Sequence, residues 1–228
     1  MFLVGLTGGI ASGKSYVASM LNEKNCKIID MDKIAREVVE PGRPAWKRIL
    51  KNFGKDILML NGEINRTLLG EIIFADENKR RILNRCTHPA IRKAVFFRLL
   101  KLFFQGHRFV ILETPLLFES GIIASFMHKI IVVYCDPDTQ LRRLMKRDGF
   151  TKEQAVQRIN AQMALRLKCE RANYVVDNSG LRDQTLKQVE KIHYELTNSN
   201  FYLRVRMILG IFCISIALVI LLTIRLLF

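Results

Sequence analysis

A glycine-rich segment over residues 8–15 has the residue types and spacing that bind a nucleoside triphosphate. It fits GxxxxGK[ST] at every fixed position, follows an apolar strand-like run and precedes a helical pattern, which is the context the motif requires. Because glycine permits backbone conformations that other residues resist, amides can approach phosphate oxygens at the positive end of the helix. The residues predicted to bind the nucleotide are Gly8, Gly9, Ile10, Ala11, Ser12, Gly13, Lys14 and Ser15.

Two of these residues carry side chains with a defined chemistry. Lys14 is predicted to place its charge against the β- and γ-phosphates of ATP. The hydroxyl of Ser15 is a predicted ligand of Mg²⁺, a hard cation that binds through oxygen. The alternative is a glycine-rich turn that binds nothing, and the strand and helix around the motif argue against it. The motif does not identify the acceptor of the phosphoryl group.

Two carboxylates, Asp30 and Asp32, follow the second strand-like run, where ligands of open α/β sheets bind. If the strand continues, both project from the same face, and one can accept the proton of an attacking hydroxyl or orient it. The alternative is a cap for a helix over Lys33–Glu40, with one aspartate capping and the other in solvent.

Three further groups are candidates for contact with the substrates. The segment His88–Arg92 places Pro89 at the expected start of a helix, and it is either a ligand site or an ordinary surface helix end. Residues 178–180 (Asn-Ser-Gly) form a turn that either ends a strand or also contacts the base. A basic run on one helix is either a solvated face or a lid that neutralises a transferring phosphoryl group. That run contains Arg142, Arg143, Lys146 and Arg147.

The elements that must position these residues alternate along the chain, which predicts an α/β fold with a buried parallel sheet. Continuous apolar runs predict strands over Phe2–Leu6, Lys27–Ile29, Phe109–Leu112, Ile130–Cys135 and Tyr174–Val176. Helical periodicity predicts helices over Lys14–Glu23, Arg66–Phe74, Ala90–Gln105 and Thr139–Arg147. Residues 33–105 contain too much helix for one crossover, so we expect a helical insertion there. Residues 137–170 are expected to form a basic, mobile lid, with a capping box at Thr151 and Gln154.

Composition limits the class of protein. The chain has 228 residues, half of them apolar and a quarter charged, which excludes a disordered or low-complexity protein. Its net charge is +15, and residues 1–200 carry +12, a surplus that suits a polyanionic partner. Nucleic acid is not the expected partner, because no basic–aromatic stacking platform is present. The five cysteines are scattered, so neither a zinc site nor a disulfide framework is expected.

The C-terminal end has the pattern of a membrane anchor. Residues 207–224 contain no charge and would span about 27 Å as a helix, close to the thickness of a bilayer core. Arg204 and Arg206 precede the segment and Arg225 follows it, which predicts that residues 1–200 face the cytosol. The alternatives are a buried core helix and a helix that covers an oligomer face.

Two further features reduce the number of candidate membranes and compartments. The short span suits a thin organelle membrane, such as the endoplasmic reticulum or the mitochondrial outer membrane. The phosphate-binding segment begins at the N-terminus, so a cleavable targeting peptide, and with it secretion, is not expected. The oligomeric state cannot be predicted from these patterns.

Seven stretches make the sequence resemble the dephospho-coenzyme A kinase family over roughly residues 2–195. They are GLTGGIASGKS (5–15), IIDMDKIAREVVEPG (28–42), THPAIR (87–92), PLLFE (115–119), LRRLMKRDGFT (141–151), RINAQM (158–163) and VVDNSG (175–180). The resemblance implies ATP-dependent phosphorylation of the ribose 3′-hydroxyl of dephospho-coenzyme A (dephospho-CoA). It also implies a P-loop NTPase-type core with a helical CoA-binding region and a lid.

The resemblance assigns roles to residues that match the family's motifs. It implies that Lys14 and Ser15 hold the triphosphate and Mg²⁺, and that Asp32 acts as the base. One position departs from the pattern, because family members often carry Asp where this chain has Glu113. The longer carboxylate could still reach Mg²⁺ through a water molecule.

The remaining assignments concern the residues that bind the acceptor, the lid arginine and the turn that contacts adenine. His88 and Arg92 match a motif that binds the acceptor. Arg147 matches a lid arginine, and Asn178 and Gly180 match a turn near adenine. Two competing hypotheses remain: a P-loop kinase for another small molecule, such as a nucleoside monophosphate or a sugar, and a membrane-tethered ATP-binding protein without catalysis.

Overall fold

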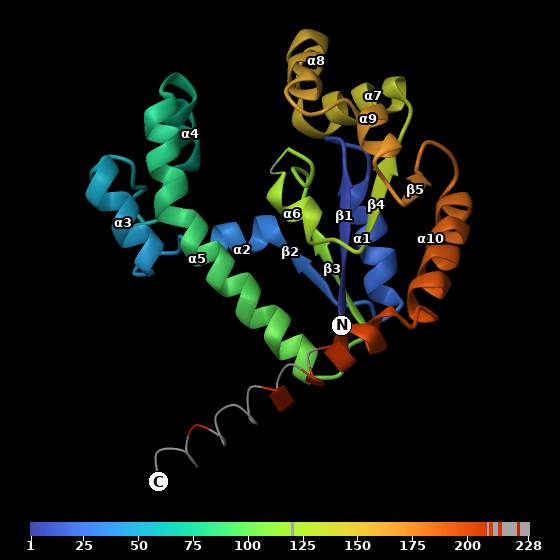
Figure 1. Cartoon of the computed structure of the whole chain (residues 1–228). Coiled ribbons are helices and arrows are strands. Elements are labelled where there is room, and N and C mark those ends of the chain that lie inside the picture. Colours follow the sequence, from blue (N-terminus) through green and yellow to red (C-terminus); the bar gives the residue numbers. More distant parts are fainter. Residues whose placement is uncertain (120, 209, 212–213, 216–222, 224–228) are drawn as a thin grey trace. The chain divides into compact units, whose positions relative to one another are not determined.

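The computed structural model describes residues 1–119, 121–208, 210, 211, 214, 215 and 223 (Figure 1). The chain divides into two compact units. The first contains residues 1–28 and 103–228, and the second contains residues 29–102. The sequence predicted a helical insertion at about 33–105, close to the bounds of the second unit.

A sheet of five strands lies at the centre of the fold, in the order β2-β3-β1-β4-β5. Strand β1 pairs in parallel with β3 and β4, and β4 pairs in parallel with β5. The carboxyl ends of β1, β3 and β4 therefore lie at one edge of the sheet, as predicted for an α/β fold. The strands are Phe2–Gly8 (β1), Ile28–Asp30 (β2), Phe109–Glu113 (β3), Lys129–Tyr134 (β4) and Tyr174–Asp177 (β5).

Helices cover both faces of the sheet in the first unit (Figure 1). Ile131 and Val133 of β4 pack with α1 and α10 in the larger core cluster. Ile130 and Val132 point to the opposite face and pack with residues of α6 and α9, because side chains alternate along a strand. The helices of this unit are Lys14–Glu23 (α1), Ile122–Ser125 (α6), Pro137–Asp148 (α7), Lys152–Asn160 (α8), Leu165–Glu170 (α9) and Arg182–Thr197 (α10).

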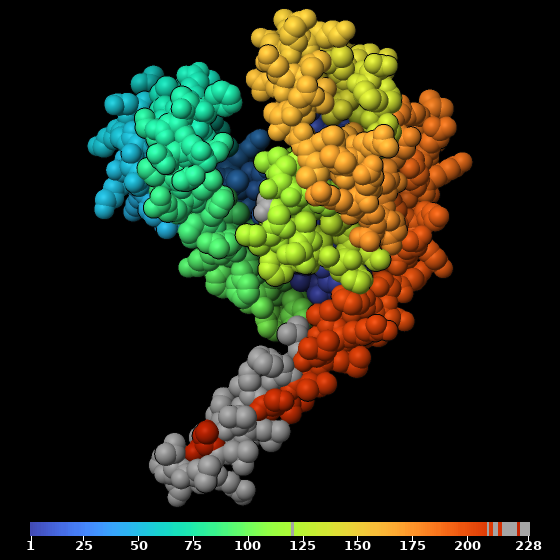
Figure 2. All heavy atoms as spheres, turned by 45° about the horizontal axis from the view of Figure 1, so that its top comes forward, coloured from blue at the N-terminus to red at the C-terminus, as the bar shows by residue number. Residues whose placement is uncertain are grey.

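Helices α7, α8 and α9 lie where the lid was predicted, and their atoms form one contiguous group, coloured yellow to orange in Figure 2. Asp136 caps α7 by accepting a hydrogen bond from the N–H of Thr139. The capping box predicted at Thr151 and Gln154 is confirmed at the start of α8. Capping fixes the residue at which each of these helices begins, and therefore the positions of the side chains that follow.

The second unit has a small core of its own, formed around buried Ile49, Ile57 and Cys86. Its helices are Met31–Glu37 (α2), Pro44–Phe53 (α3), Arg66–Ala75 (α4) and Glu77–Phe104 (α5), the last of which continues into the first unit. The indole N–H of Trp46 donates to the carbonyl of Gly62, 3.1 Å away. This bond holds the loop between α3 and α4 against the core.

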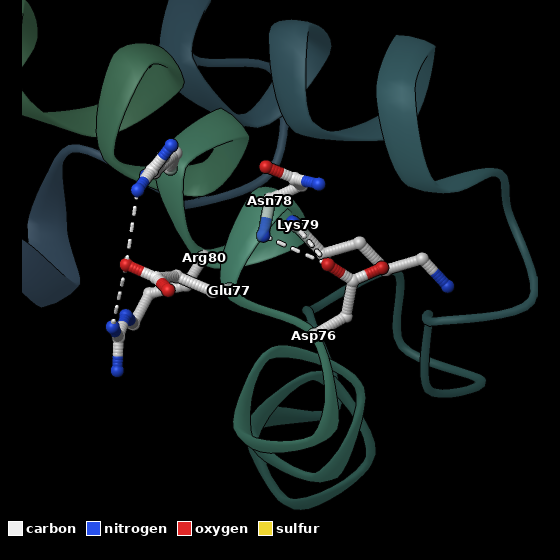
Figure 3. A network of polar contacts seen from close by, with 6 residues as sticks. Asp76, Glu77, Asn78, Lys79 and Arg80 are labelled. Carbon is white, nitrogen blue, oxygen red and sulfur yellow. Dashed lines mark hydrogen bonds and ion pairs between the residues drawn. The ribbon is translucent and has the colours of Figure 1, made fainter.

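Polar contacts fix the start of α5 (Figure 3). The Asp76 carboxylate accepts hydrogen bonds from the backbone N–H groups two and three residues later, at 2.8 and 3.2 Å. Glu77 forms ion pairs with Arg80 at 3.5 Å and with Arg81 at 3.1 Å. An acidic first turn of this kind compensates the positive end of the helix dipole.

The predicted helix start at Pro89 is wrong. Pro89 lies in the interior of α5, which is 28 residues long and begins at Glu77. A proline inside a helix costs about 3 kcal/mol, because it removes one backbone hydrogen bond and crowds the preceding turn. The helix continues here because Cys86 and neighbouring apolar residues of the same helix pack into the core of the second unit.

The aromatic residues before the apolar tail pack on the protein. Phe201 stacks on the ring of His128, with centroids 3.6 Å apart, and also contacts Phe2 edge-on. Tyr202 packs against the same core and lies beneath the guanidinium of Arg108. Burial lowers the pKa of His128, so the ring is neutral at physiological pH.

Among the described residues, none belongs to a helix long and apolar enough to cross a bilayer. Most of the predicted anchor, residues 207–224, lies outside the described residues. Of its described members, Met207, Ile208, Ile211 and Ile214 are exposed.

A buried lysine organises the loop that follows β3. Lys168 of α9 is 0% exposed and donates to the carbonyl oxygen of Pro115 at 2.8 Å. Its ammonium also pairs with Glu119 at 2.8 Å. A buried cation without such partners would be very costly, so this pair ties the loop to α9.

Glu119→Gln should lower the free energy of unfolding at pH 7 by about 1–3 kcal/mol, because Lys168 loses its counter-charge. Burial raises the pKa of Glu119, but the hydrogen bonds from Lys168 and from the backbone outweigh it and lower the pKa below 4.5. A carboxyl whose pKa is lowered by folding stabilises the protein above about pH 4.5 and loses that contribution as pH falls through the folded value. The difference in Tm between wild type and variant should therefore be larger at pH 7 than at pH 3, and a constant difference would contradict the assignment.

Candidate active site

The phosphate loop leaves the first amides of α1 open. Gly13 caps the helix in the left-handed conformation, at φ 93°, and Ala11 before it has φ 58°. No side chain caps α1, and its first turn contains no acidic residue. Helices α7 and α8, by contrast, are capped by side-chain oxygens. An uncapped helix end with its dipole unopposed is suited to an external anion.

Asn178 holds this loop through a hydrogen bond to its backbone. Its side-chain amide donates to the carbonyl oxygen of Ser12 at 2.9 Å and accepts from the hydroxyl of Thr185 at 3.2 Å. A Cβ atom on Gly13 would overlap the Asn178 amide, so this position requires glycine for space as well as for its φ angle. Asn178 is 6% exposed, and the structure places both ends of its amide on protein atoms. Its predicted contact with the nucleotide, and that of exposed Gly180, stays a prediction.

Lys14 forms an ion pair with Glu113, which ends the neighbouring strand β3. The Nζ and Oε1 atoms are 2.6 Å apart, and the two side chains are 15% and 9% exposed. The parallel pairing of β1 and β3 sets Glu113 opposite Leu6, beside the start of the loop. Glu113 therefore contacts the predicted catalytic lysine directly. Any phosphate bound by Lys14 must compete with this carboxylate.

The two best lid candidates differ in their surroundings. Arg147 makes two hydrogen bonds to Asp148, at 2.8 and 2.9 Å, which raise the pKa of its guanidinium. Arg143, on the same helix, lies beside the loop: its Nη1 atom is 3.9 Å from the position of a Cβ on Gly13. This nitrogen is buried and has no hydrogen-bond partner among the described residues. Arg143 is therefore better placed than Arg147 for a ligand of the loop, a distinction that the basic run alone did not make.

The aspartates of the acceptor side have separate roles. Strand β2 ends at Asp30, which caps α2 by accepting from the N–H of Lys33 at 2.9 Å. The strand does not continue through Asp32, because the capped helix begins at Met31, so Asp30 follows the capping alternative. Asp32 lies in the first turn of α2 and is exposed, so its carboxylate is available to a ligand.

His88 and Arg92 are exposed and lie one turn apart on α5, on the same face of the helix. They belong to the second unit with Asp32, whereas Lys14 and Glu113 belong to the first. That the groups meet on one substrate stays a prediction.

The oxygen donors near the loop suit Mg²⁺. This ion keeps several waters and usually takes one or two protein oxygens together with substrate phosphates. The exposed hydroxyl of Ser15, in the first turn of α1, and the carboxylate of Glu113 are donors of that kind. The residues present therefore fit the ion when phosphate oxygens supply its other ligands.

Sequence reasoning missed three residues that hold the site together: Gln140, Gln162 and Lys168. Each makes side-chain hydrogen bonds to backbone far away in the sequence. Glutamine and lysine are common on helix surfaces, so their type gave no signal. Gln162 lies within RINAQM, one of the stretches that carry the resemblance to the family, but the resemblance assigns it no role.

The fold and the site define a P-loop phosphotransferase: a five-stranded sheet in the order 2-3-1-4-5, an open phosphate loop after its central strand, and the basic helix α7. The family model for dephospho-CoA kinase matches residues 2–184. The chain belongs to the dephospho-CoA kinase family.

Individual relatives are similar to this chain over most of its length. The chain is 50% identical over 206 residues to a dephospho-CoA kinase domain-containing protein of Danio rerio, covering 90% of each chain. It is 48% identical to the dephospho-CoA kinase of Geobacillus kaustophilus, covering 82% of this chain and 92% of that one. Among solved structures, the dephospho-CoA kinase of Campylobacter jejuni has a TM-score of 0.64 at 30% identity, covering 85% of this chain and 96% of that chain.

Glu113→Gln should tighten the binding of Mg²⁺-free ATP about fivefold, because Lys14 no longer has to leave a carboxylate to reach a phosphate. Isothermal titration measures this directly. Glu113→Asp retains the charge on a shorter side chain and separates loss of the contact from loss of the charge. Glu190→Gln removes the carboxylate of a surface ion pair with Lys24 and should leave ATP affinity unchanged. Equal affinity in Glu113→Gln and wild type would show that the ion pair does not compete with the nucleotide.

Proposed function

We propose that the protein transfers the γ-phosphoryl group of ATP to the ribose 3′-hydroxyl of dephospho-CoA. The observation that carries this proposal is the open, uncapped phosphate loop in a chain that matches the dephospho-CoA kinase family over residues 2–184. Relatives named dephospho-CoA kinase match over more than four-fifths of this chain.

The phosphate loop supplies the donor side of the reaction. Its amides and Lys14 hold the triphosphate and spread the negative charge that develops on the transferred group. Mg²⁺, held by Ser15 and through water by Glu113, would neutralise phosphate charge when bound. Arg143 and Arg147 add positive charge from the lid, and closure of the lid excludes water that would hydrolyse ATP.

The second unit supplies the acceptor side. Asp32 is exposed at the start of α2, where its carboxylate can orient the 3′-hydroxyl and accept its proton. His88 and Arg92 present polar and charged groups on one face of α5, suited to the phosphates of the acceptor. The net charge of +12 on residues 1–200 favours the approach of two polyanionic substrates.

A coupled ADP-release assay with dephospho-CoA and a panel of nucleoside monophosphates and sugars tests the proposal. Turnover only with dephospho-CoA supports it, and turnover only with another acceptor identifies a different small-molecule kinase. A folded Lys14→Ala variant should be inactive. ATP binding without turnover of any acceptor would support the alternative of a nucleotide-binding protein without catalysis.

Asp32→Asn should reduce kcat by roughly 10²–10⁴-fold, the usual contribution of a general base. The amide keeps the size of the side chain but cannot accept the proton. Steady-state kinetics measure the effect, and Asp138→Asn, at another exposed first-turn position, is the control. Full activity of Asp32→Asn would remove Asp32 from the proposed role.

We also propose that residues 207–224 anchor the protein in an organelle membrane, with the kinase in the cytosol. The support is the uncharged run of 18 residues between arginines and the exposure of its described apolar members. The endoplasmic reticulum and the mitochondrial outer membrane are the candidate locations, because both suit a short span.

Ile214→Arg, near the middle of this segment, should release the full-length protein from membranes, because a central arginine costs about 2.5–3.5 kcal/mol on insertion. Met207→Arg, at the edge, should leave the protein bound, since an arginine there reaches the interface. Fractionation and imaging of tagged protein measure both variants. If both variants and the wild type are in the soluble fraction, the segment packs on protein and not in a bilayer.

A further inference from the structure

Both backbone polar groups of Ile10 in the phosphate loop are held by glutamine side chains. The Nε2 atom of Gln140 donates to the Ile10 carbonyl oxygen at 2.8 Å. The N–H of Ile10 donates to the Oε1 atom of Gln162 at 2.9 Å. We refer to these three residues, Gln140, Ile10 and Gln162, as the glutamine clamp. Both glutamines are more than 100 residues from Ile10 in the sequence, so only the fold brings them together.

Both glutamines come from the lid. Gln140 lies in the first turn of α7, and Gln162 lies between α8 and α9. Gln140 is 5% exposed, and a buried amide of this kind is costly unless its hydrogen bonds are made. The clamp therefore connects the loop that holds phosphate to two separate parts of the lid.

Gly9 leaves room for the clamp. The motif GxxxxGK[ST] leaves this position open to any residue. In the structure, a Cβ atom on Gly9 would lie 2.6 Å from the Nε2 atom of Gln140, so the end of that side chain would have to move. Such a movement would disturb the hydrogen bond from Gln140 to Ile10.

The segment that carries Gln162 also contacts the loop after β3. The N–H of Met163 donates to Glu119 at 3.1 Å, and Glu119 pairs with buried Lys168 of α9. The segment is thus tied to the loop after β3 on one side and to the phosphate loop on the other. A displacement of the lid segment would move Ile10 or break the clamp.

We propose that Gln140 and Gln162 are positioning residues that set the conformation of the phosphate loop through Ile10, so that ATP affinity depends on the state of the lid. The proposal rests on the proposed function only in taking ATP as the ligand of the loop. The two hydrogen bonds run in opposite directions, since one glutamine must donate and the other must accept. This polarity permits a test that a general effect on packing cannot mimic.

Gln140→Met and Gln162→Met, made in the full-length chain, remove the amide at nearly constant volume. Each should weaken ATP binding by about five- to tenfold, measured by titration. The double variant should bind ATP within about twofold of the weaker single variant, because one broken bond already releases the loop. Gln157→Met, at an exposed position of α8, is the control and should have no effect. Additive losses, or no loss, would overturn the proposal.

The glutamate variants test the direction of each bond. Gln162→Glu keeps an acceptor for the Ile10 N–H, whereas Gln140→Glu places a carboxylate against the Ile10 carbonyl. Both add one negative charge beside the same residue, so the comparison largely cancels repulsion of ATP. Gln140→Glu should bind ATP at least about fivefold more weakly than Gln162→Glu. Equal affinities or the reverse order would contradict the clamp.

Amide hydrogen exchange at Ile10, measured without nucleotide, keeps this test separate from the proposed activity. The exchange rate should rise at least about tenfold in Gln162→Met and remain unchanged in Gln157→Met. If wild type proves inactive with dephospho-CoA, the exchange and ATP-binding results still decide whether the clamp exists. Unchanged exchange at Ile10 in Gln162→Met would refute it even in an active kinase.

Discussion

The site depends on one constraint: the first amides of α1 must stay open to bind phosphate, so the protein cannot satisfy them itself. A side-chain cap would stabilise the helix by about 1 kcal/mol, and α7 and α8 have such caps. Helix α1 has Gly13 in the left-handed conformation instead. The loop must then be held in place by contacts on its other atoms. Asn178 on Ser12 and the glutamine clamp on Ile10 are contacts of this type.

The cationic side chains of the site differ in whether they have an acidic partner. Lys14 pairs with Glu113, which fixes the direction of its ammonium group beside the loop. Arg143 faces the loop with a nitrogen that has no hydrogen-bond partner among the described residues, whereas Arg147 is paired with Asp148. A ligand with several negative oxygens can therefore engage Arg143 without first breaking an ion pair. The thiol of Cys135, which follows β4, is unsuited to act as a nucleophile, because burial raises its pKa to about 11.

One sequence prediction failed because a tertiary contact outweighed a local preference, and one open alternative was decided by local structure. Pro89 was expected to start a helix, but α5 passes through it because the turns before it pack into the core of the second unit. The pair Asp30 and Asp32 was compatible with two local structures, and the immediate start of α2 selected the capped one.

The sequence by itself determined the alternation of strands and helices, the phosphate loop and the family. These are encoded locally, in the periodicity of apolar residues and in motifs whose glycines and charged side chains have fixed spacing. Only the tertiary structure decided which side chains support the loop, because Gln140, Asn178 and Gln162 are each more than 100 residues away from the loop residue they hold. It likewise decided that Glu113 contacts Lys14, through the parallel pairing of β1 with β3. A hydrogen bond between distant residues depends on strand order and helix placement, and no local pattern of residue types records either.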